Sequence, residues 1–415
     1  MDNVVNLQAG AKPKRNARRR RSSKTALVLG GGGFSGGVYE IGALRALDLL
    51  SVNKSINDFD VYVGTSSGSM IASFAANGIT PEQMMRVVND QVPTPFKDID
   101  MGSLLRPNVR DFITKGLQLP FHLLEIARQI PRSLLTLSPV ELALMLADRL
   151  PSGFYSGAGI EEYVHDVLIA DGRTDDFRAL IGKELYLAAT DLDTCERIVL
   201  GAEGWDDVPI SSAVRASTAL PMIYKPHTIK GRELVDGGIV STTNLDIADE
   251  AGAKFVVVVN PIVPYVNDFS SEVGGPFGGG RPKHVSDLGF TKIGYQTFKL
   301  LAYQRLHEMA SRWEERYPGV DILLIEPEPD DQLMFETSIL DYSSRIDVAR
   351  HGFQSVTVKL AEDYERLHEM SARHGIEISA TRVRKVVQHF GVEREKTRAW
   401  RRILEQTTGA LLRQS

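Results

Sequence analysis

Cysteine is scarce in this chain of 415 residues, with Cys195 the only one. A single cysteine excludes any disulfide within the chain, as is typical of proteins in a reducing compartment. Long apolar runs are missing too. The longest, 255–266, is interrupted by Asn260, Pro261 and Pro264 and falls short of the roughly 18 residues that a membrane-spanning helix needs. The sequence therefore predicts neither a disulfide-stabilised secreted domain nor a transmembrane helix.

An export signal is not expected either. Four arginines at 18–21 precede a short aliphatic stretch at 26–29, an arrangement that resembles a twin-arginine signal. The stretch is too short for the apolar region of a signal peptide and continues directly into the glycines 30–33. We therefore expect a cytoplasmic protein.

The formal net charge of −5 is unevenly distributed. Residues 1–24 carry eight basic side chains against one acidic one, a net charge of +7, so the rest of the chain carries −12. Such an arm can be a disordered, merely solvated segment. Alternatively it is attracted to an anionic membrane, a contribution on the order of 1 kcal/mol per basic residue. A nucleic-acid arm would need aromatic residues or a binding fold beside it, so we expect no nucleic acid and predict transient contact with the inner face of the membrane.

Strands alternate with helices along the chain, which predicts an α/β fold with a mainly parallel sheet covered on both faces. The ordinary apolar content of 43% provides a sizeable core. The expected strands are 25–29, 59–63, 184–189, 232–236, 254–259 and 320–325, and the expected helices are 38–50, 70–77, 291–316 and 346–374. We assign residues 25–375 to one catalytic domain.

Three further segments differ in composition. A helical insertion is expected at about 101–155, where a capping box at 138–141 begins a helix that is apolar nearly all round. It either packs onto the sheet or forms a lid or acyl-chain groove. Residues 268–290 form a glycine-rich loop, and 376–415 form a basic helical tail.

The segment Gly64-Thr65-Ser66-Ser67-Gly68 is a G-x-S-x-G pattern directly after the strand 59–63. A serine at a sharp turn between strand and helix exposes its hydroxyl to a substrate, and Gly64 and Gly68 allow the tight backbone of such an elbow. Ser66 is therefore a candidate nucleophile. Because two glycines around a serine also recur by chance, the pattern needs support from the rest of the sequence.

A glycine loop follows the first strand. Gly31-Gly32-Gly33-Phe34-Ser35-Gly36 matches the G-x-G-x-x-G pattern of dinucleotide-binding folds. Such folds need an acidic residue at the end of the second strand. This chain has Gly64-Thr65-Ser66 there instead, which argues against a dinucleotide site. Backbone N–H groups in a glycine turn before a helix also form a nest for an oxyanion, and one such donor stabilises a transition state by about 2.7–4 kcal/mol. The loop is a candidate oxyanion hole, and no cofactor or metal is expected.

A base for Ser66 is harder to find, because none of the nine histidines has an obviously catalytic context. His227, between Pro226 and Thr228, is expected to lie in a turn. Asp236 ends a short apolar strand and is followed by two glycines. Taken alone, an aspartate before Gly-Gly is usually a turn residue.

Together these segments resemble the patatin-like phospholipase family. The resemblance extends over about 25–375 and rests on motifs in the family's order: the glycine loop, the helix start Gly36-Gly37-Val38-Tyr39-Glu40-Ile41-Gly42, the elbow 64–68, Ala189-Thr190-Asp191-Leu192, Val214-Arg215-Ala216-Ser217-Thr218-Ala219-Leu220-Pro221, and Asp236-Gly237-Gly238. Two places depart from the family. Phe34-Ser35 stands where a basic residue is usual, and Ser241-Thr242-Thr243-Asn244-Leu245 replaces an Asn-x-Pro-like segment.

The resemblance implies a three-layer α/β/α fold and a Ser–Asp dyad without histidine. Ser66 would be the nucleophile, Asp236 the base, and residues 31–36 the oxyanion hole. The expected substrate is a phospholipid or lysophospholipid ester. An acyltransferase with the same dyad and a catalytically weak membrane scaffold are the alternatives, although a scaffold has no need to keep both Ser66 and Asp236. The oligomeric state is not predicted.

Overall fold

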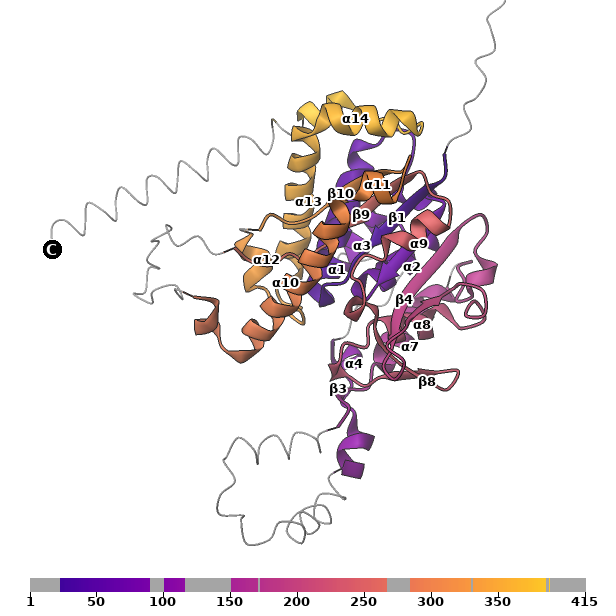
Figure 1. Cartoon of the computed structure of the whole chain (residues 1–415), viewed down its shortest axis with the longest axis vertical. Coiled ribbons are helices and arrows are strands. Elements are labelled where there is room, and N and C mark those ends of the chain that lie inside the picture. Colours follow the sequence, from indigo (N-terminus) through magenta and orange to yellow (C-terminus); the bar gives the residue numbers. More distant parts are fainter. Residues whose placement is uncertain are drawn as a thin grey trace, which may run out of the picture.

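A computed structural model describes residues 23–89, 101–115, 151–170, 172–266, 284–329, 331–385 and 388. Most of the expected insertion, most of the glycine-rich loop 268–290 and most of the basic tail lie outside these residues. The helix expected to begin at the capping box 138–141 lies outside them as well. Figure 1 shows the described elements coloured along the sequence.

The sheet and its helices follow the alternation expected from the sequence. The strands are β1 (Thr25–Leu29), β2 (Val61–Thr65), β3 (Gly153–Tyr155), β4 (Glu184–Asp191), β5 (Arg197–Leu200), β6 (Met222–Tyr224), β7 (His227–Ile229), β8 (Arg232–Asp236), β9 (Phe255–Val259) and β10 (Asp321–Ile325). The helices are α1 (Gly33–Leu50), α2 (Ser67–Ala76), α3 (Pro81–Val88), α4 (Met101–Leu104), α7 (Ala158–Leu168), α8 (Ile210–Ser217), α9 (Leu245–Glu250), α10 (Phe290–Ala310), α11 (Trp313–Arg316), α12 (Gln332–Glu336), α13 (Arg345–Glu362) and α14 (Tyr364–Arg373).

The main sheet has the strand order β10-β9-β1-β2-β4-β8-β7, and β5 pairs with β4. The five strands from β10 to β4 are mutually parallel, whereas β5, β7 and β8 add antiparallel pairs. The expected mainly parallel sheet is therefore confirmed. The short strands β3 and β6 form a separate parallel pair.

Helices cover both faces of the sheet because alternate residues of each central strand point in opposite directions. On one face, Leu27 and Leu29 of β1 belong to a core that includes α1, α2, α3 and α13. On the other face, Ala26 and Val28 pack with α9 and α11. Each large apolar side chain buried in this way contributes about 1.5–3 kcal/mol. The predicted three-layer α/β/α architecture is confirmed (Figure 1).

Helices α1 and α13 cross so closely that their backbones touch. A Cβ atom on Gly42 would lie 2.4 Å from the carbonyl oxygen of Ala349, and one on Gly352 would lie 2.6 Å from that of Tyr39. Only glycine fits at both positions, because real Cβ atoms do not approach backbone oxygens so closely. This crossing fixes α1, and α1 begins in the glycine loop.

Two long helices expected from the sequence are each divided. The helix expected at 291–316 is interrupted at 311–312 between α10 and α11, and that expected at 346–374 is interrupted at Asp363 between α13 and α14. The second interruption lets α14 turn across the end of α13 (Figure 1) and bury Leu367 and Met370 in the core. Packing of these two side chains overrides the continuous helical pattern of the sequence.

The described ends of the arm and tail are tied to the domain. The Lys24 ammonium donates to Glu184 at 2.5 Å, while Ile376 and Val383 are buried in the main core. Arg382 donates to the carbonyl oxygens of Leu49 and Ser51 at the end of α1. In the described part of the chain, no helix is both long and apolar enough to cross a membrane.

We predict that Gly42→Ala lowers the free energy of unfolding by about 1–3 kcal/mol, because the added methyl overpacks the crossing of α1 and α13. Urea unfolding followed by circular dichroism measures the change. Gly294→Ala in α10 is the matched control. A Cβ there meets nothing within 4 Å, so alanine should leave stability equal or raise it by up to about 1 kcal/mol. Equal effects of the two substitutions would contradict the close crossing.

Candidate active site

The register of β4 brings the two key loops together. Ala188 of β4 pairs with Thr65, the last residue of β2, and the next residue, Ala189, pairs with Asp236, the last residue of β8. Ser66 follows Thr65 directly. Two side chains 170 residues apart in the sequence therefore meet beside consecutive residues of one strand.

The elbow at Ser66 is strained, as expected for a nucleophile at a strand-to-helix turn. Ser66 has φ 54° and ψ −128°, a conformation that costs a non-glycine residue on the order of 1–3 kcal/mol. The surrounding packing holds it there. A Cβ on Gly68 would lie 2.3 Å from the carbonyl oxygen of Gly30, and one on Gly64 would lie 2.5 Å from the Cα of Ser69. Both flanking glycines of the pattern are thus required by close backbone contacts.

Ser217 at the end of α8 fixes the backbone of the elbow. Its hydroxyl accepts a hydrogen bond from the Ser66 N–H at 3.0 Å and donates one to the carbonyl oxygen of Ala188 at 2.6 Å. Ser217 is fully buried, so no water competes for these bonds. The Ser217 hydroxyl therefore links the backbone of Ser66 to β4, the strand that also pairs with Asp236.

The Ser66 hydroxyl donates a hydrogen bond of 2.5 Å to Oδ2 of Asp236. Every other polar group of Asp236 is also held. The Gly238 N–H donates to Oδ1 at 2.8 Å, the Asp236 N–H donates to the Ala219 carbonyl at 3.0 Å, and the Thr190 hydroxyl donates to the Asp236 carbonyl at 3.2 Å. With so many partners, the carboxylate has one defined orientation toward Ser66.

Burial sets the proton affinity of Asp236. The side chain is almost completely enclosed, and this loss of solvation raises the pKa of its carboxyl from 3.8 to about 6. Hydrogen bonds from Ser66 and the Gly238 N–H act in the opposite direction but only in part. Above about pH 6 the group is a carboxylate, and it is a stronger base than an exposed aspartate.

The glycine loop lies directly against the nucleophile. A Cβ atom on Gly31 would be 3.0 Å from the Cβ of Ser66 and 3.6 Å from its hydroxyl. Gly32 and Gly33 have φ of 153° and 65°, backbone conformations that favour glycine. The loop thus brings main-chain groups to the place where an acyl oxygen would lie after attack by Ser66.

The predicted set of oxyanion donors needs correction at two positions. The Phe34 N–H donates to the carbonyl oxygen of Ile339 at 2.7 Å, and the Gly36 N–H donates to that of Gly32 at 3.1 Å. Neither group is free to bind an oxyanion. Within the described part of this loop, the N–H groups of Gly31, Gly32, Gly33 and Ser35 have no backbone acceptor, and neither does that of Ser67 at the start of α2.

The two departures from the family pattern have structural consequences. The Phe34 ring packs against Tyr342 with centroids 5.2 Å apart, and Ser35 is buried, so neither supplies a cation to the site. In the other segment, the buried Asn244 donates to the Thr65 hydroxyl at 2.9 Å. Asn244 therefore links the loop after Asp236 to the residue before Ser66.

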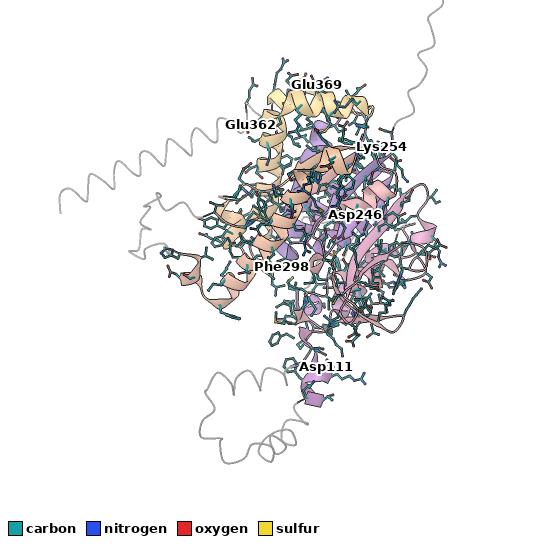
Figure 2. The ribbon with its side chains drawn as sticks, in the orientation of Figure 1. Asp111, Asp246, Lys254, Phe298, Glu362 and Glu369 are labelled. Carbon is teal, nitrogen blue, oxygen red and sulfur yellow. The ribbon has the colours of Figure 1, made fainter. Side chains whose placement is uncertain are left out.

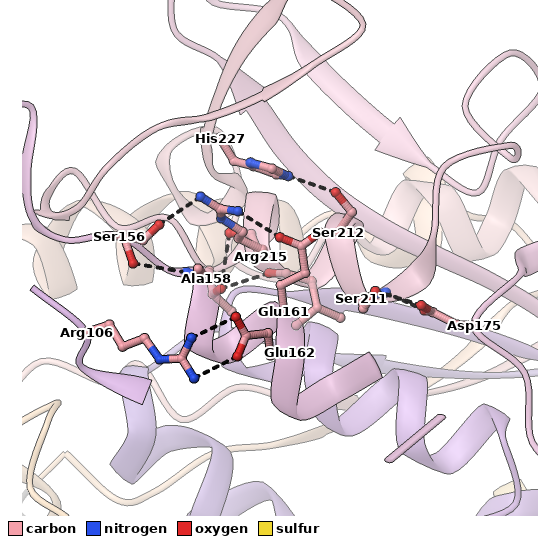
Figure 3. A network of polar contacts seen from close by, with 12 residues as sticks. Arg106, Ser156, Ala158, Glu161, Glu162, Asp175, Ser211, Ser212, Arg215 and His227 are labelled. Carbon is pink, nitrogen blue, oxygen red and sulfur yellow. Dashed lines mark hydrogen bonds and ion pairs between the residues drawn. The ribbon is translucent and has the colours of Figure 1, made fainter. Parts of the chain in front are cut away.

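His227 takes no part in this site. It begins β7 rather than lying in a turn, so that expectation was wrong, and its Nε2 lies 2.7 Å from the Ser212 hydroxyl (Figure 3). Burial lowers the pKa of His227 to about 4, so it is neutral near pH 7. The neighbouring Arg215 is engaged with Glu161 and the Ser156 carbonyl in the same network.

Three residues that hold the site were not assigned from the sequence: Thr190, Ser217 and Asn244. Thr190 and Ser217 lie in segments that carry the family resemblance, and Asn244 lies in the segment that departs from it. Their roles depend on long-range contacts that a local pattern does not contain. Within the described ranges, no three histidine, cysteine, aspartate or glutamate side chains gather as metal ligands.

We predict that Asp236→Asn stabilises the fold at neutral pH. The raised pKa means that the folded state binds the proton more tightly than the unfolded chain, so ionisation of Asp236 costs stability as the pH rises from about 4 to above 6. Asparagine avoids this cost. The difference in free energy of unfolding between variant and wild type should grow by about 3 kcal/mol between pH 4 and pH 8 in urea titrations. A difference independent of pH would contradict the buried carboxylate.

Two curated relatives share part of this chain. The uncharacterized protein YqhO of Bacillus subtilis is 24% identical over 219 residues, which cover 49% of this chain and 63% of the relative. The probable lipid hydrolase 463L of Invertebrate iridescent virus 6 is 24% identical over 232 residues, covering 54% of this chain and 62% of the relative. The chain thus spans less than two thirds of the length of either protein.

Similar solved structures include VipD from Legionella pneumophila, with 14% identity, a TM-score of 0.34 and coverage of 85% of this chain and 74% of that one. The type III effector ExoU of Pseudomonas aeruginosa has 15% identity, a TM-score of 0.33 and coverage of 81% and 52%. At such TM-scores these similarities support no conclusion about activity.

The family described as Patatin-like phospholipase has a model that matches residues 27–249. The match includes the glycine loop, the elbow at Ser66, the end of α8 and Asp236. It therefore contains every contact of the Ser66–Asp236 pair described above and extends over more than half of the sequence. The chain belongs to the patatin-like phospholipase family.

Proposed function

We propose that this protein is a serine hydrolase of phospholipid or lysophospholipid esters, with Ser66 as nucleophile and Asp236 as base. The observation that carries the proposal is the 2.5 Å hydrogen bond from the strained, buried Ser66 to the buried carboxylate of Asp236. Membership of the family and the similarity to a probable lipid hydrolase support a lipid ester as substrate.

In the first step, the Asp236 carboxylate accepts the Ser66 proton while the serine oxygen attacks the ester carbonyl. The tetrahedral intermediate carries its negative charge on the former carbonyl oxygen. When it collapses, the bond to the alcohol oxygen breaks, and the alcohol leaves with the proton held by Asp236. The acyl group remains on Ser66 as an ester.

In the second step, Asp236 takes a proton from a water molecule whose oxygen attacks the acyl-enzyme. Collapse of this second intermediate returns the proton to the Ser66 oxygen and releases the fatty acid. An alcohol in place of water would give acyl transfer with the same residues. We favour hydrolysis, in keeping with the lipid hydrolase among the relatives.

The free N–H groups around Ser66 supply the electrostatic stabilisation that each step needs. A Cβ on Gly31 would lie 3.6 Å from the serine hydroxyl, and Ser67 adds the first N–H of α2. Each such donor stabilises a transition state by about 2.7–4 kcal/mol, because it needs no reorientation as charge develops. A neighbouring cation is not needed in this arrangement.

We further propose that the protein works in the cytoplasm and contacts the inner face of the membrane transiently. The support is the charge of +7 over residues 1–24, which favours an anionic surface.

A fluorophosphonate probe tests the nucleophile. Labelling at Ser66 of the folded protein is expected, and Ser66→Ala should abolish it. Ser66→Ala and Asp236→Asn should each lower kcat for a soluble short-chain ester by about a thousandfold or more, because each removes one half of the dyad.

His227→Asn is the control for the choice of base. His227 contacts Ser212 rather than Ser66, so this variant should keep wild-type turnover. A wild-type protein that fails to label, or a His227→Asn variant as inactive as Asp236→Asn, would overturn the assignment.

A second prediction concerns Ser217. Ser217→Ala removes the acceptor of the Ser66 N–H, and an unpaired buried N–H costs about 1–3 kcal/mol. Because this destabilises the elbow itself, we expect kcat and the rate of fluorophosphonate labelling to fall by about tenfold or more, with KM little changed.

Ser73→Ala is the matched control for Ser217→Ala. Ser73 is equally buried, and its hydroxyl donates to a backbone carbonyl of α2, that of Ser69, at 2.7 Å without touching Ser66. This variant should lose stability but keep its labelling rate. Equal losses of labelling rate in Ser217→Ala and Ser73→Ala would show that Ser217 contributes to stability alone.

A further inference from the structure

Helix α10 presents apolar side chains to solvent on one face. Phe290, Ile293, Thr297 and Leu301 recur at spacings of three and four residues and are all exposed, with Phe290 90% and Leu301 64% accessible. The outward face of a helix on a soluble domain is normally polar. We call Phe290, Ile293 and Leu301 the α10 face.

Helix α10 contacts the loop that follows Asp236. The Phe298 ring (Figure 2) approaches to 3.9 Å from where a Cβ of Gly238 would be, and the Arg305 guanidinium donates to the carbonyl oxygen of Val240. Ile239, between these two contacts, is itself 44% exposed. An exposed apolar side chain thus lies three residues from the proposed base, in the loop that α10 contacts.

A second patch of exposed apolar side chains is linked to Asp236 through Ala219. The Asp236 N–H binds the Ala219 carbonyl, and three residues later Met222 of β6 is 76% exposed. Met222 pairs with Gly153 of β3, next to the exposed Phe154. The ring of Phe112, also exposed, lies 6.3 Å from that of Phe154. We call Phe112, Phe154 and Met222 the β6 rim.

The two patches lie toward the same end of the molecule. In Figure 1 the beginning of α10 and the β3 strand are both in the lower part of the view, and α14 is at the top. Each patch is linked to the Ser66–Asp236 pair through the contacts of Gly238, Val240 and Ala219 described above, where β2 and β8 end. Exposed cations accompany the β6 rim: Arg110 lies two residues before Phe112 and Lys115 three residues after it, in the helical stretch 109–115.

We propose that the α10 face and the β6 rim together dock on a phospholipid bilayer. Large apolar side chains beside cations suit the boundary of a bilayer, where acyl chains lie below phosphate groups. The inference rests on the proposed function. Ser66 is only 9% exposed, and a long-chain lipid ester resides in a bilayer rather than in water, so the surface around the site has to meet the bilayer for this ester to reach Ser66.

Vesicle binding tests the docking surface. The full chain carrying Ser66→Ala, which cannot hydrolyse the lipid, is sedimented with vesicles of phosphatidylcholine and phosphatidylglycerol. Adding Phe290→Glu with Leu301→Glu, or Met222→Glu, should weaken binding by about tenfold or more, because a charge replaces an inserted apolar side chain. These residues are exposed, so the fold tolerates the changes.

Ile181→Glu is the matched control. Ile181 is 95% exposed but precedes β4, at the end of that strand opposite to Ala188 and Ala189. The same apolar-to-acidic change there should leave vesicle binding unaltered. Binding that is unchanged in the face and rim variants, or weakened equally by Ile181→Glu, would overturn the inference.

Activity separates docking from catalysis. With Ser66 intact, the face and rim variants should lose hydrolysis of vesicle lipids but keep wild-type turnover of a soluble short-chain ester. Equal loss on both substrates would overturn the docking role, since the site itself would then be damaged.

A wild-type protein that binds vesicles through these patches but labels nowhere with fluorophosphonate would refute the proposed function alone. If the variants instead dissociate an oligomer in analytical ultracentrifugation, the surface is an interface between copies and the inference fails.

Discussion

The hydrogen bond between Ser66 and Asp236 is the constraint on which the rest of the site depends. It joins the ends of β2 and β8, and it forms only because consecutive residues of β4 pair with those two ends. Holding it requires an unfavourable φ at Ser66 and a buried carboxylate at Asp236, each of which costs stability. The surrounding contacts, from Ser217 to Asn244, offset these costs and fix one geometry.

The chemistry of the pair follows from where it is buried. In water an aspartate is a weak base, but desolvation raises the pKa of Asp236 to about 6, near the pH at which a general base is most useful. Two hydrogen bonds hold the Asp236 backbone, and the Gly238 N–H holds its carboxylate toward Ser66, the orienting role that a third residue performs in a triad. The proposed mechanism therefore uses no histidine, and the buried His227 is neutral and engaged elsewhere.

The sequence predicted what local patterns encode and missed what distant contacts decide. The central strands, the glycine loop and the elbow could be recognised because strand alternation and glycine spacing are local signals. The antiparallel pairing of β4 with β8 and the hydroxyl of Ser217 depend on segments far apart in the chain. The same reason explains why Phe34 was wrongly predicted as an oxyanion donor. Its N–H binds Ile339, about three hundred positions away. Asp363 likewise ends a helix whose apolar pattern continues, because α14 gains core contacts by turning.

The loop after Asp236 links the proposed docking surface to the proposed base. Gly238 donates the N–H that lowers the pKa of Asp236, and Phe298 of α10 lies 3.9 Å from where a Cβ of the same glycine would be. A shift of α10 would therefore bear on the carboxylate: losing the Gly238 hydrogen bond would raise the pKa of Asp236 further and leave it free to turn from Ser66. Arg305 opposes such a shift by binding the carbonyl of Val240 in the same loop. Helix α10 is thus held beside the loop that follows Asp236, so the proposed docking surface and the proposed base keep a fixed relation.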